Sequence, residues 1–97
     1  MARYVLAFRS DPNRAASADE EAAWGNWFGE LGAAVADFGN RVGRAQMLGG
    51  SSGLGSALSG YVVITAEDFD AAVALAQGCP GLRSGGQVEV GEIAATP

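Results

Sequence analysis

The amino-acid sequence predicts a single α+β domain whose elements follow the order strand, helix, strand, strand, helix, strand. Three observations support this prediction. Residues 3–9 and 60–65 are rich in the β-branched and aromatic residues that favour strands. Two other segments have apolar residues three and four positions apart behind helix-capping residues. Finally, 97 residues suit one domain, which we expect to span residues 1–97 with a modest hydrophobic core.

The first half of the chain predicts a central strand followed by one long helix. Residues 3–9 form the strand, and Ser17 with Glu20 matches the S-x-x-E capping box that opens a helix near residue 18. We expect this helix to reach residues 37–39, because apolar residues recur at helical spacing up to that point. Its predicted buried stripe consists of Trp24, Trp27, Phe28, Leu31, Ala34, Val35 and Phe38. Close packing against the sheet is expected at Gly25, Gly29 and Gly32.

Two further strands are predicted in the middle of the chain. Residues 44–48 form a short, weakly apolar strand, and residues 60–65 (GYVVIT) form the clearest strand of the sequence. Between them, residues 49–59 are rich in glycine and serine, which predicts a flexible connection.

The remainder of the chain predicts a second helix and a last strand. Thr65 and Asp68 match another capping box, so a helix is expected over residues 67–77, and Pro80 prevents its continuation. Its predicted buried face consists of Phe69, Ala72, Val73 and Ala76. Residues 87–93 alternate between apolar and polar side chains, which is typical of a strand.

The first and third strands are apolar on both sides. Because side chains alternate along a strand, Tyr4, Leu6 and Phe8 point to one face of the sheet, and Val5 and Ala7 point to the other. Two helices cover one face of a four-stranded sheet and leave the second with more apolar surface than a monomer usually exposes. We therefore expect a ferredoxin-like βαββαβ fold that pairs sheet against sheet into a homodimer. The alternative is that the long loops fold over the open face.

Three segments of the chain, taken in order, resemble one family. They are WGNWFGELGAAVADFGNRVG at 24–43, GYVVITAEDFDAAVALAQGCPGL at 60–82 and GGQVEVGEI at 85–93. These segments are similar to the YCII-related proteins, in particular to a branch with a W-G-x-W helix, a G-Y-x-I-x-x-A strand and a closing V-E-V strand. The resemblance implies a ferredoxin-like domain that forms a dimeric α+β barrel. Most members of the family have no assigned activity.

Two departures from that branch concern its chemistry. Arg41 stands where the branch commonly has proline after G-N, and Cys79 stands where it often has histidine. A His/Asp pair has been proposed as catalytic in other branches, but this chain has no histidine, so that chemistry cannot be carried over. We expect Cys79 to be a buried, unreactive packing residue, because it follows the negative end of a helix and has no neighbouring histidine.

Composition excludes several kinds of partner and site. The net charge of −5 opposes binding to nucleic acid, and no apolar run is long enough for a membrane span or a signal sequence. With no histidine and one cysteine, the sequence predicts no zinc site of the Cys/His type. It predicts no cofactor, because the glycine pattern at 53–58 lacks the third glycine of a dinucleotide loop and the chain has no lysine. A cytoplasmic location is expected.

The candidate ligand-binding residues are those that place polar groups beside apolar surface. They are Trp24, Asn40, Arg44 and Tyr61. Packing, and for Arg44 a surface ion pair, are the competing structural roles.

Three functions remain open from the sequence. The first is a dimeric domain that binds a small molecule. The second is a lyase or isomerase acting on a small organic acid, with Tyr61 or Asp11 moving a proton and Arg44 holding a carboxylate. The third is a protein-interaction module that uses a sheet edge.

Overall fold

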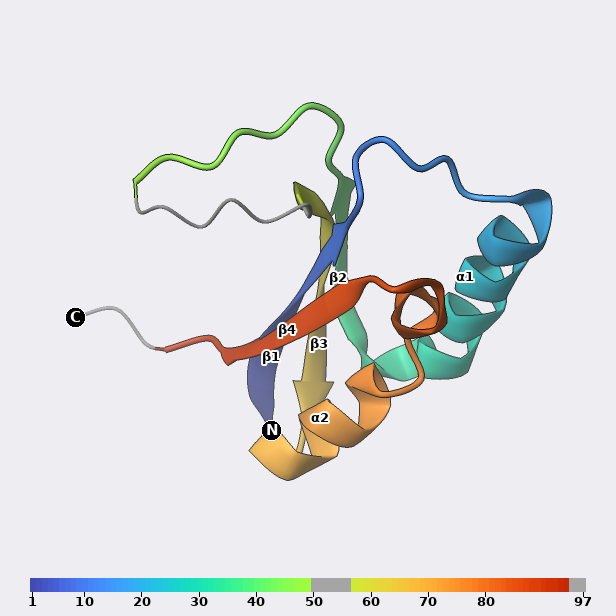
Figure 1. Ribbon diagram of the computed structural model, residues 1–97. Coiled ribbons are helices and arrows are strands. Elements are labelled where there is room, and N and C mark those ends of the chain that lie inside the picture. Colours follow the sequence, from blue (N-terminus) through green and yellow to red (C-terminus); the bar gives the residue numbers. More distant parts are fainter. Residues whose placement is uncertain (50–56, 95–97) are drawn as a thin grey trace.

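The computed structural model, which describes residues 1–49 and 57–94, contains one antiparallel four-stranded sheet and two α-helices (Figure 1). The elements in chain order are β1 (Ala2–Ser10), α1 (Ala18–Leu31), η1 (Gly32–Ala34), β2 (Val35–Arg41), β3 (Ala57–Ala66), α2 (Phe69–Ala76), η2 (Pro80–Ser84) and β4 (Gln87–Glu92), where η marks a 3₁₀ helix. The sheet order is β2-β3-β1-β4. This arrangement confirms the predicted α+β class and is compatible with a ferredoxin-like fold. Residues 50–56, which hold most of the predicted flexible connection and of the glycine pattern at 53–58, lie outside the described residues.

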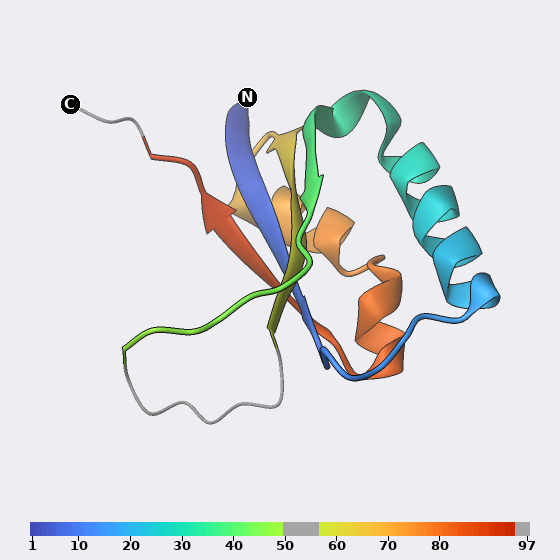
Figure 2. The same ribbon diagram turned by 90° about the horizontal axis from the view of Figure 1, so that it is seen from above.

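Both helices lie on one face of the sheet, and the hydrophobic core fills the space between them (Figures 1 and 2). In β1, Tyr4, Leu6 and Phe8 are buried and alternate with less buried residues, as the sequence predicts. Across the β1–β3 ladder Tyr4 pairs with Ile64 and Leu6 with Val62, and all four side chains are at most 2% exposed. The centre of the domain is therefore a regular two-layer packing of sheet and helices.

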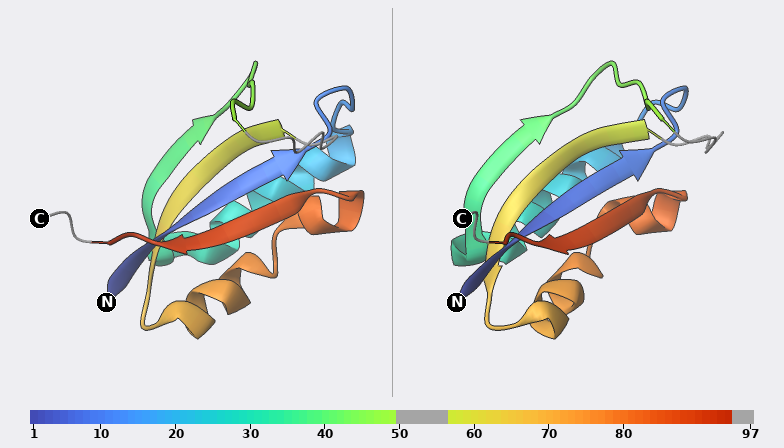
Figure 3. Two further views of the ribbon diagram at one scale, coloured as in Figure 1. Left: turned by 60° about the vertical axis from the view of Figure 1, so that its left-hand side comes forward. Right: turned by 90° about the vertical axis from the view of Figure 1, so that its left-hand side faces the viewer.

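The other face of the sheet carries no helix in the described structure, as the view onto the strands shows (Figure 3). Val5 pairs with Val63 and Ala7 with Tyr61, so these four side chains share that face. Residues 42–49 extend from the sheet on the same side (Figure 2). We refer to this surface below as the open face.

Helix α1 begins where the sequence predicts and ends earlier. Ser17 is its N-cap and accepts a hydrogen bond from the Glu20 backbone N–H at 3.1 Å, which confirms the predicted cap. The helix ends at Leu31, not at residues 37–39, because Gly32 adopts a positive φ of 51°. The predicted role of the helix glycines is wrong as well. A Cβ built at Gly25, Gly29 or Gly32 would meet nothing within 4 Å, so no close packing requires them.

The second strand is Val35–Arg41, and residues 44–48 are not a strand, contrary to the prediction. Apolar residues continue at helical spacing past Leu31, although the helix ends there. This spacing predicted helix where β2 begins four residues later, at Val35. Phe38, predicted to lie on the buried helix stripe, therefore lies in β2 and is 69% exposed.

Strand β2 is irregular in its pairing with β3. The register shifts between Val35 and Asp37 and again between Asp37 and Asn40. Gly39 lies within the second shift at φ 65°, and a Cβ there would fall 2.0 Å from the Tyr61 carbonyl oxygen. Only glycine allows this approach without moving the backbone.

Helix α2 is capped by Asp68, not by Thr65. The Asp68 carboxylate accepts from the Ala71 backbone N–H at 2.8 Å, whereas the Thr65 hydroxyl, inside β3, donates to the Ala34 carbonyl at 3.4 Å. Phe69, predicted to be buried, is 46% exposed at the first position of the helix and meets the Tyr4 ring edge-on at 6.1 Å. The capping aspartate moves the helix start to Phe69, while Ala72 and Ala76 are buried as predicted.

The segment after α2 is held against the core. Cys79 is 2% exposed, as expected for a packing residue, and burial raises the pKa of its thiol. Pro80 opens the short helix η2, which the sequence did not predict and which leads into β4. Within residues 1–49 and 57–94, no helix combines the length and the apolarity needed to cross a lipid bilayer.

Candidate functional site

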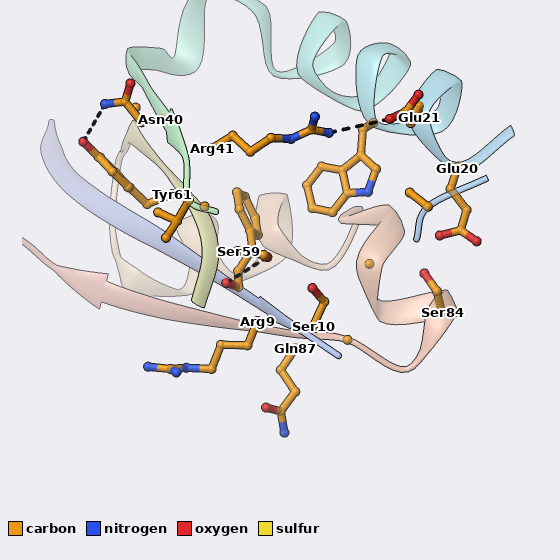
Figure 4. A pocket seen from close by; sticks show the side chains of 18 of the residues that line it. Arg9, Ser10, Glu20, Glu21, Asn40, Arg41, Ser59, Tyr61, Ser84 and Gln87 are labelled. Atoms are coloured by element: carbon orange, nitrogen blue, oxygen red, sulfur yellow. Dashed lines mark hydrogen bonds and ion pairs between the residues drawn. The ribbon is translucent and has the colours of Figure 1, made fainter. Parts of the chain in front are cut away.

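A cleft of about 520 Å³ lies between the N-terminal half of α1, the end of β2 and η2 (Figure 4). Its volume is within the range of about 300–1,000 Å³ that is usual for sites of small organic molecules. Large aromatic side chains lie between the helix and the sheet here, and the cleft opens beside them. Helix α1 and the edge strand β2 therefore form the walls of the cleft.

The floor of the cleft is a cluster of aromatic rings from three elements. Phe8 of β1 meets Trp24 of α1 with ring centroids 4.9 Å apart and planes at 79°. Phe28 lies 6.1 Å from Trp24 and 6.3 Å from Phe38 of β2, which extends the cluster to the rim. Phe8 is buried, Trp24 and Phe28 are half-buried and Phe38 is exposed. The rings become more exposed toward the opening, so they form a continuous apolar surface.

Two glycines near η2 leave room for the two indole rings. A Cβ at Gly81 would lie 3.1 Å from Cζ2 of Trp24, and a Cβ at Gly78 would lie 2.9 Å from Nε1 of Trp27. Trp27 is buried below the cleft and its Nε1–H donates to the Leu75 carbonyl at 3.4 Å. Trp27 thus has a structural role, while Trp24 lines the cleft.

Arg14 and Glu20 form a hydrogen-bonded ion pair on the rim of the cleft. Both terminal nitrogens of Arg14 donate to the Glu20 carboxylate, at 3.0 and 2.5 Å. This hydrogen bonding lowers the pKa of Glu20 and raises that of Arg14. The pair fixes the loop after β1 to the first turn of α1, and each side chain uses two hydrogen bonds to hold the other.

A second pair of charges faces across the mouth of the cleft. Arg41, at the end of β2, extends toward Glu21 on α1, and their closest atoms are 3.8 Å apart (Figure 4). Their side chains are 84% and 59% exposed, so solvent screens the attraction. The arginine departs from the proline expected in the resembling branch, and it supplies a cation at the mouth.

The structure separates the four candidate residues predicted from the sequence. Trp24 lines the cleft, and Arg44 is exposed and is not among the lining residues. Asn40 and Tyr61 border the cleft, but the Asn40 amide donates to the Tyr61 hydroxyl at 3.1 Å at the end remote from Glu21 (Figure 4). The Tyr61 side chain belongs to the open face, opposite Ala7.

The bulge at Gly39 explains why β2 serves both faces. Residues two apart in a regular strand share a face, yet the Phe38 ring packs against Phe28 of α1 whereas Asn40 bonds Tyr61 of the open face. The register shift between Asp37 and Asn40 accounts for the change of side. The same bulge brings Phe38 to the cleft.

Sequence reasoning missed the residues that give the cleft its character: Phe8, Phe28 and Phe38 on the floor, with Glu21 and Arg41 at the mouth. Phe28 and Phe38 were assigned to a core stripe, and Glu21 to the acidic first turn of a helix. A strand prediction over 35–41 would have identified Phe38 and Arg41, since VADFGNR contains the glycine typical of a bulge.

The chain was compared with family models, curated proteins and solved structures. No family model, no curated protein and no solved structure matches the chain. In the part of the chain that the structure describes, no three His, Cys, Asp or Glu side chains come together in a group that could hold a metal ion.

Proposed function

We propose that this protein is a small-molecule-binding domain and that the cleft between α1 and the β2 edge is its binding site. The observation that carries the proposal is the aromatic floor, which rises from buried Phe8 to exposed Phe38 inside a cleft of ligand size. Phe38 packs against Phe28 and is 69% exposed, so most of its ring is free to contact a ligand in the cleft.

The shape of the floor favours a flat, apolar ligand body. The rings of Trp24, Phe28 and Phe38 line one side of the cleft, and an aromatic ligand can pack against them edge-on or in offset stacking. Polar groups surround this apolar floor, with Asn40 and Tyr61 on one side of the cleft and Ser84 and Glu20 on the other (Figure 4). The ligand can therefore carry polar groups at its edges.

Isothermal titration with indole, a flat and neutral probe, tests the proposal. We expect Phe38→Ala to weaken indole binding about three- to tenfold, the equivalent of one aromatic contact of about 0.5–1.5 kcal/mol. Phe69→Ala is the matched control. It removes a partly exposed ring from α2 that does not line the cleft, so the affinity for indole should not change. Equal losses in both variants, or no binding of indole to the unmodified protein, would show that the cleft is not a site for such ligands.

We also propose that the domain is a homodimer joined through the open face, in the manner of the dimeric barrel implied by the YCII-related resemblance. The support is the pair of partly exposed apolar residues Val5 and Ala7, which lie beside the 8% exposed Val63 on a face that no helix covers in the described structure. The aromatic floor of the cleft lies on the helix side, and Tyr61 at its border belongs to the open face, so each copy would keep an accessible floor beside the dimer contact.

Light scattering coupled to size exclusion tests the dimer. Val5→Glu places a charge in the centre of the open face and is expected to yield monomer, whereas Val5→Thr, which preserves the shape, is expected to retain most of the dimer. A monomeric unmodified protein at micromolar concentration would contradict the proposal. Circular dichroism of both variants separates dissociation from unfolding.

A further inference from the structure

The mouth of the cleft holds two opposite charges whose hydrogen-bonding capacity is unused. Arg41 Nη2 lies 3.8 Å from Glu21 Oε1, which is longer than a hydrogen bond. Neither side chain makes a hydrogen bond to another residue within 1–49 or 57–94, whereas neighbouring Arg14 and Glu20 are bound to each other twice. The charged Arg9 side chain extends away from the cavity (Figure 4). Asp11 also lines the cleft, and one of its carboxylate oxygens accepts a hydrogen bond from the Asn13 backbone N–H at 2.8 Å. Arg41 and Glu21 are thus the two opposite charges that face each other at the mouth.

Because these two opposite charges lie side by side, they favour a ligand that carries both a negative and a positive group. An anion bound to Arg41 would lie beside the Glu21 carboxylate, and a cation bound to Glu21 would lie beside the Arg41 guanidinium. Either arrangement places like charges close together, which opposes binding. A zwitterion avoids this repulsion, because its carboxylate accepts from Arg41 while its ammonium group donates to Glu21. It replaces one long, screened contact with two charge-assisted hydrogen bonds.

The apolar part of the ligand follows from the floor. The Phe28 and Phe38 rings lie between the two elements that carry Glu21 and Arg41, with centroids 6.3 Å apart. A flat side chain attached to the zwitterionic group would pack against these rings. We propose that the cleft binds free α-amino acids with an aromatic side chain. This inference rests on the proposed function, that the cleft holds flat small molecules.

Three ligands with the same indole body separate the contributions. L-Tryptophan carries both charges, tryptamine carries only the ammonium group, and indole-3-propionate carries only the carboxylate. In isothermal titration we expect tryptophan to bind about two- to fivefold more tightly than either single-charge ligand, which is the gain usual for one solvent-exposed ion pair.

Variants at the mouth should change these preferences in opposite directions. Arg41→Gln is expected to weaken tryptophan binding about two- to fivefold and to strengthen tryptamine binding, since it removes the repelling cation. Glu21→Gln is expected to weaken tryptophan similarly and to strengthen indole-3-propionate. Arg44→Gln removes a nearby exposed arginine that does not line the cleft, and should change no affinity.

The outcomes distinguish this inference from the function on which it rests. Tryptophan binding that is strongest and depends on both Arg41 and Glu21 supports the inference. If indole binds and depends on Phe38, but a single-charge ligand equals or exceeds tryptophan, the zwitterion inference is wrong and the binding function stands. If indole and all three ligands fail to bind the unmodified protein, both proposals are wrong.

Discussion

The centre of the sheet and its edge at α1 and β2 are built in different ways. Around β1 and β3, the strands pair in regular register over most of their length, and residues such as Leu6 and Ile64 are completely buried. Around α1 and β2, the helix ends at a glycine with positive φ, the strand shifts register twice, and Phe38 remains exposed. The first region supplies stability, and the second holds the cleft. The irregular end of α1 and the register shifts of β2 thus occur in the same region as the cleft.

The largest expected difference between the regions is in the cost of removing a side chain. Leu6→Ala, at the regular centre, should lower the free energy of unfolding by about 2–5 kcal/mol, because it leaves a cavity among close-packed residues. Phe38→Ala removes a larger side chain but should cost less than about 0.5 kcal/mol, since its ring is mostly exposed. Urea denaturation of the two variants measures both values. A Phe38→Ala cost as large as that of Leu6→Ala would mean that the cleft rim is part of the core.

The next difference concerns glycines. Gly39→Ala should destabilise the fold by at least about 1–3 kcal/mol, because a Cβ at φ 65° would be strained and would overlap the Tyr61 carbonyl. Gly25→Ala, where a Cβ meets nothing, should stabilise α1 by about 0.5–1 kcal/mol. Thermal unfolding followed by circular dichroism compares them. Two shifts of the same sign would contradict the bulge that turns Phe38 toward the cleft.

The sequence predicted the regular region well because its signals there are local. The β-branched and aromatic residues of 3–9 and 60–65 predicted β1 and β3, and the Ser17 cap placed the start of α1. Prediction failed between Leu31 and residue 48. There the end of a helix depends on the φ of Gly32, and Phe38 is positioned by a bulge that forms only when β2 pairs with β3. Of the candidate site, Trp24 was predicted to line a pocket, but the pairing of Arg41 with Glu21 depends on tertiary structure that no local pattern records.

A smaller effect distinguishes the true cap of α2 from the predicted one. Asp68→Ala should cost about 0.5–2 kcal/mol, because it removes the side-chain acceptor for the Ala71 N–H. Thr65→Val keeps the shape of the strand residue and loses only a 3.4 Å hydrogen bond to Ala34, so it should cost less than about 1 kcal/mol. Denaturation midpoints of the two variants rank them, and the reverse ranking would restore Thr65 as the cap.

The smallest expected effect is the pH dependence of the Arg14–Glu20 pair at the cleft wall. Arg14 lowers the Glu20 pKa in the folded state, so the pair's stabilisation is present above the unfolded value of about 4.3 and is lost as the pH falls through the lower folded value. Glu20→Gln should therefore flatten the decline in stability in acid, whereas Glu30→Gln, elsewhere on α1, changes the same charge without touching Arg14. Denaturant unfolding at pH 7, 4 and 3 tests this. An unchanged acid decline in Glu20→Gln would show that the pair contributes nothing.

The most direct test of the account is to locate a bound ligand. Isotope-filtered NMR of the ¹³C-labelled protein with unlabelled indole records contacts between ligand protons and individual side chains. The account predicts contacts to the rings of Trp24, Phe28 and Phe38, with none to Val5 and Val63. Contacts confined to Val5 and Val63 would place the ligand on the open face and contradict the assignment of the cleft as the binding site.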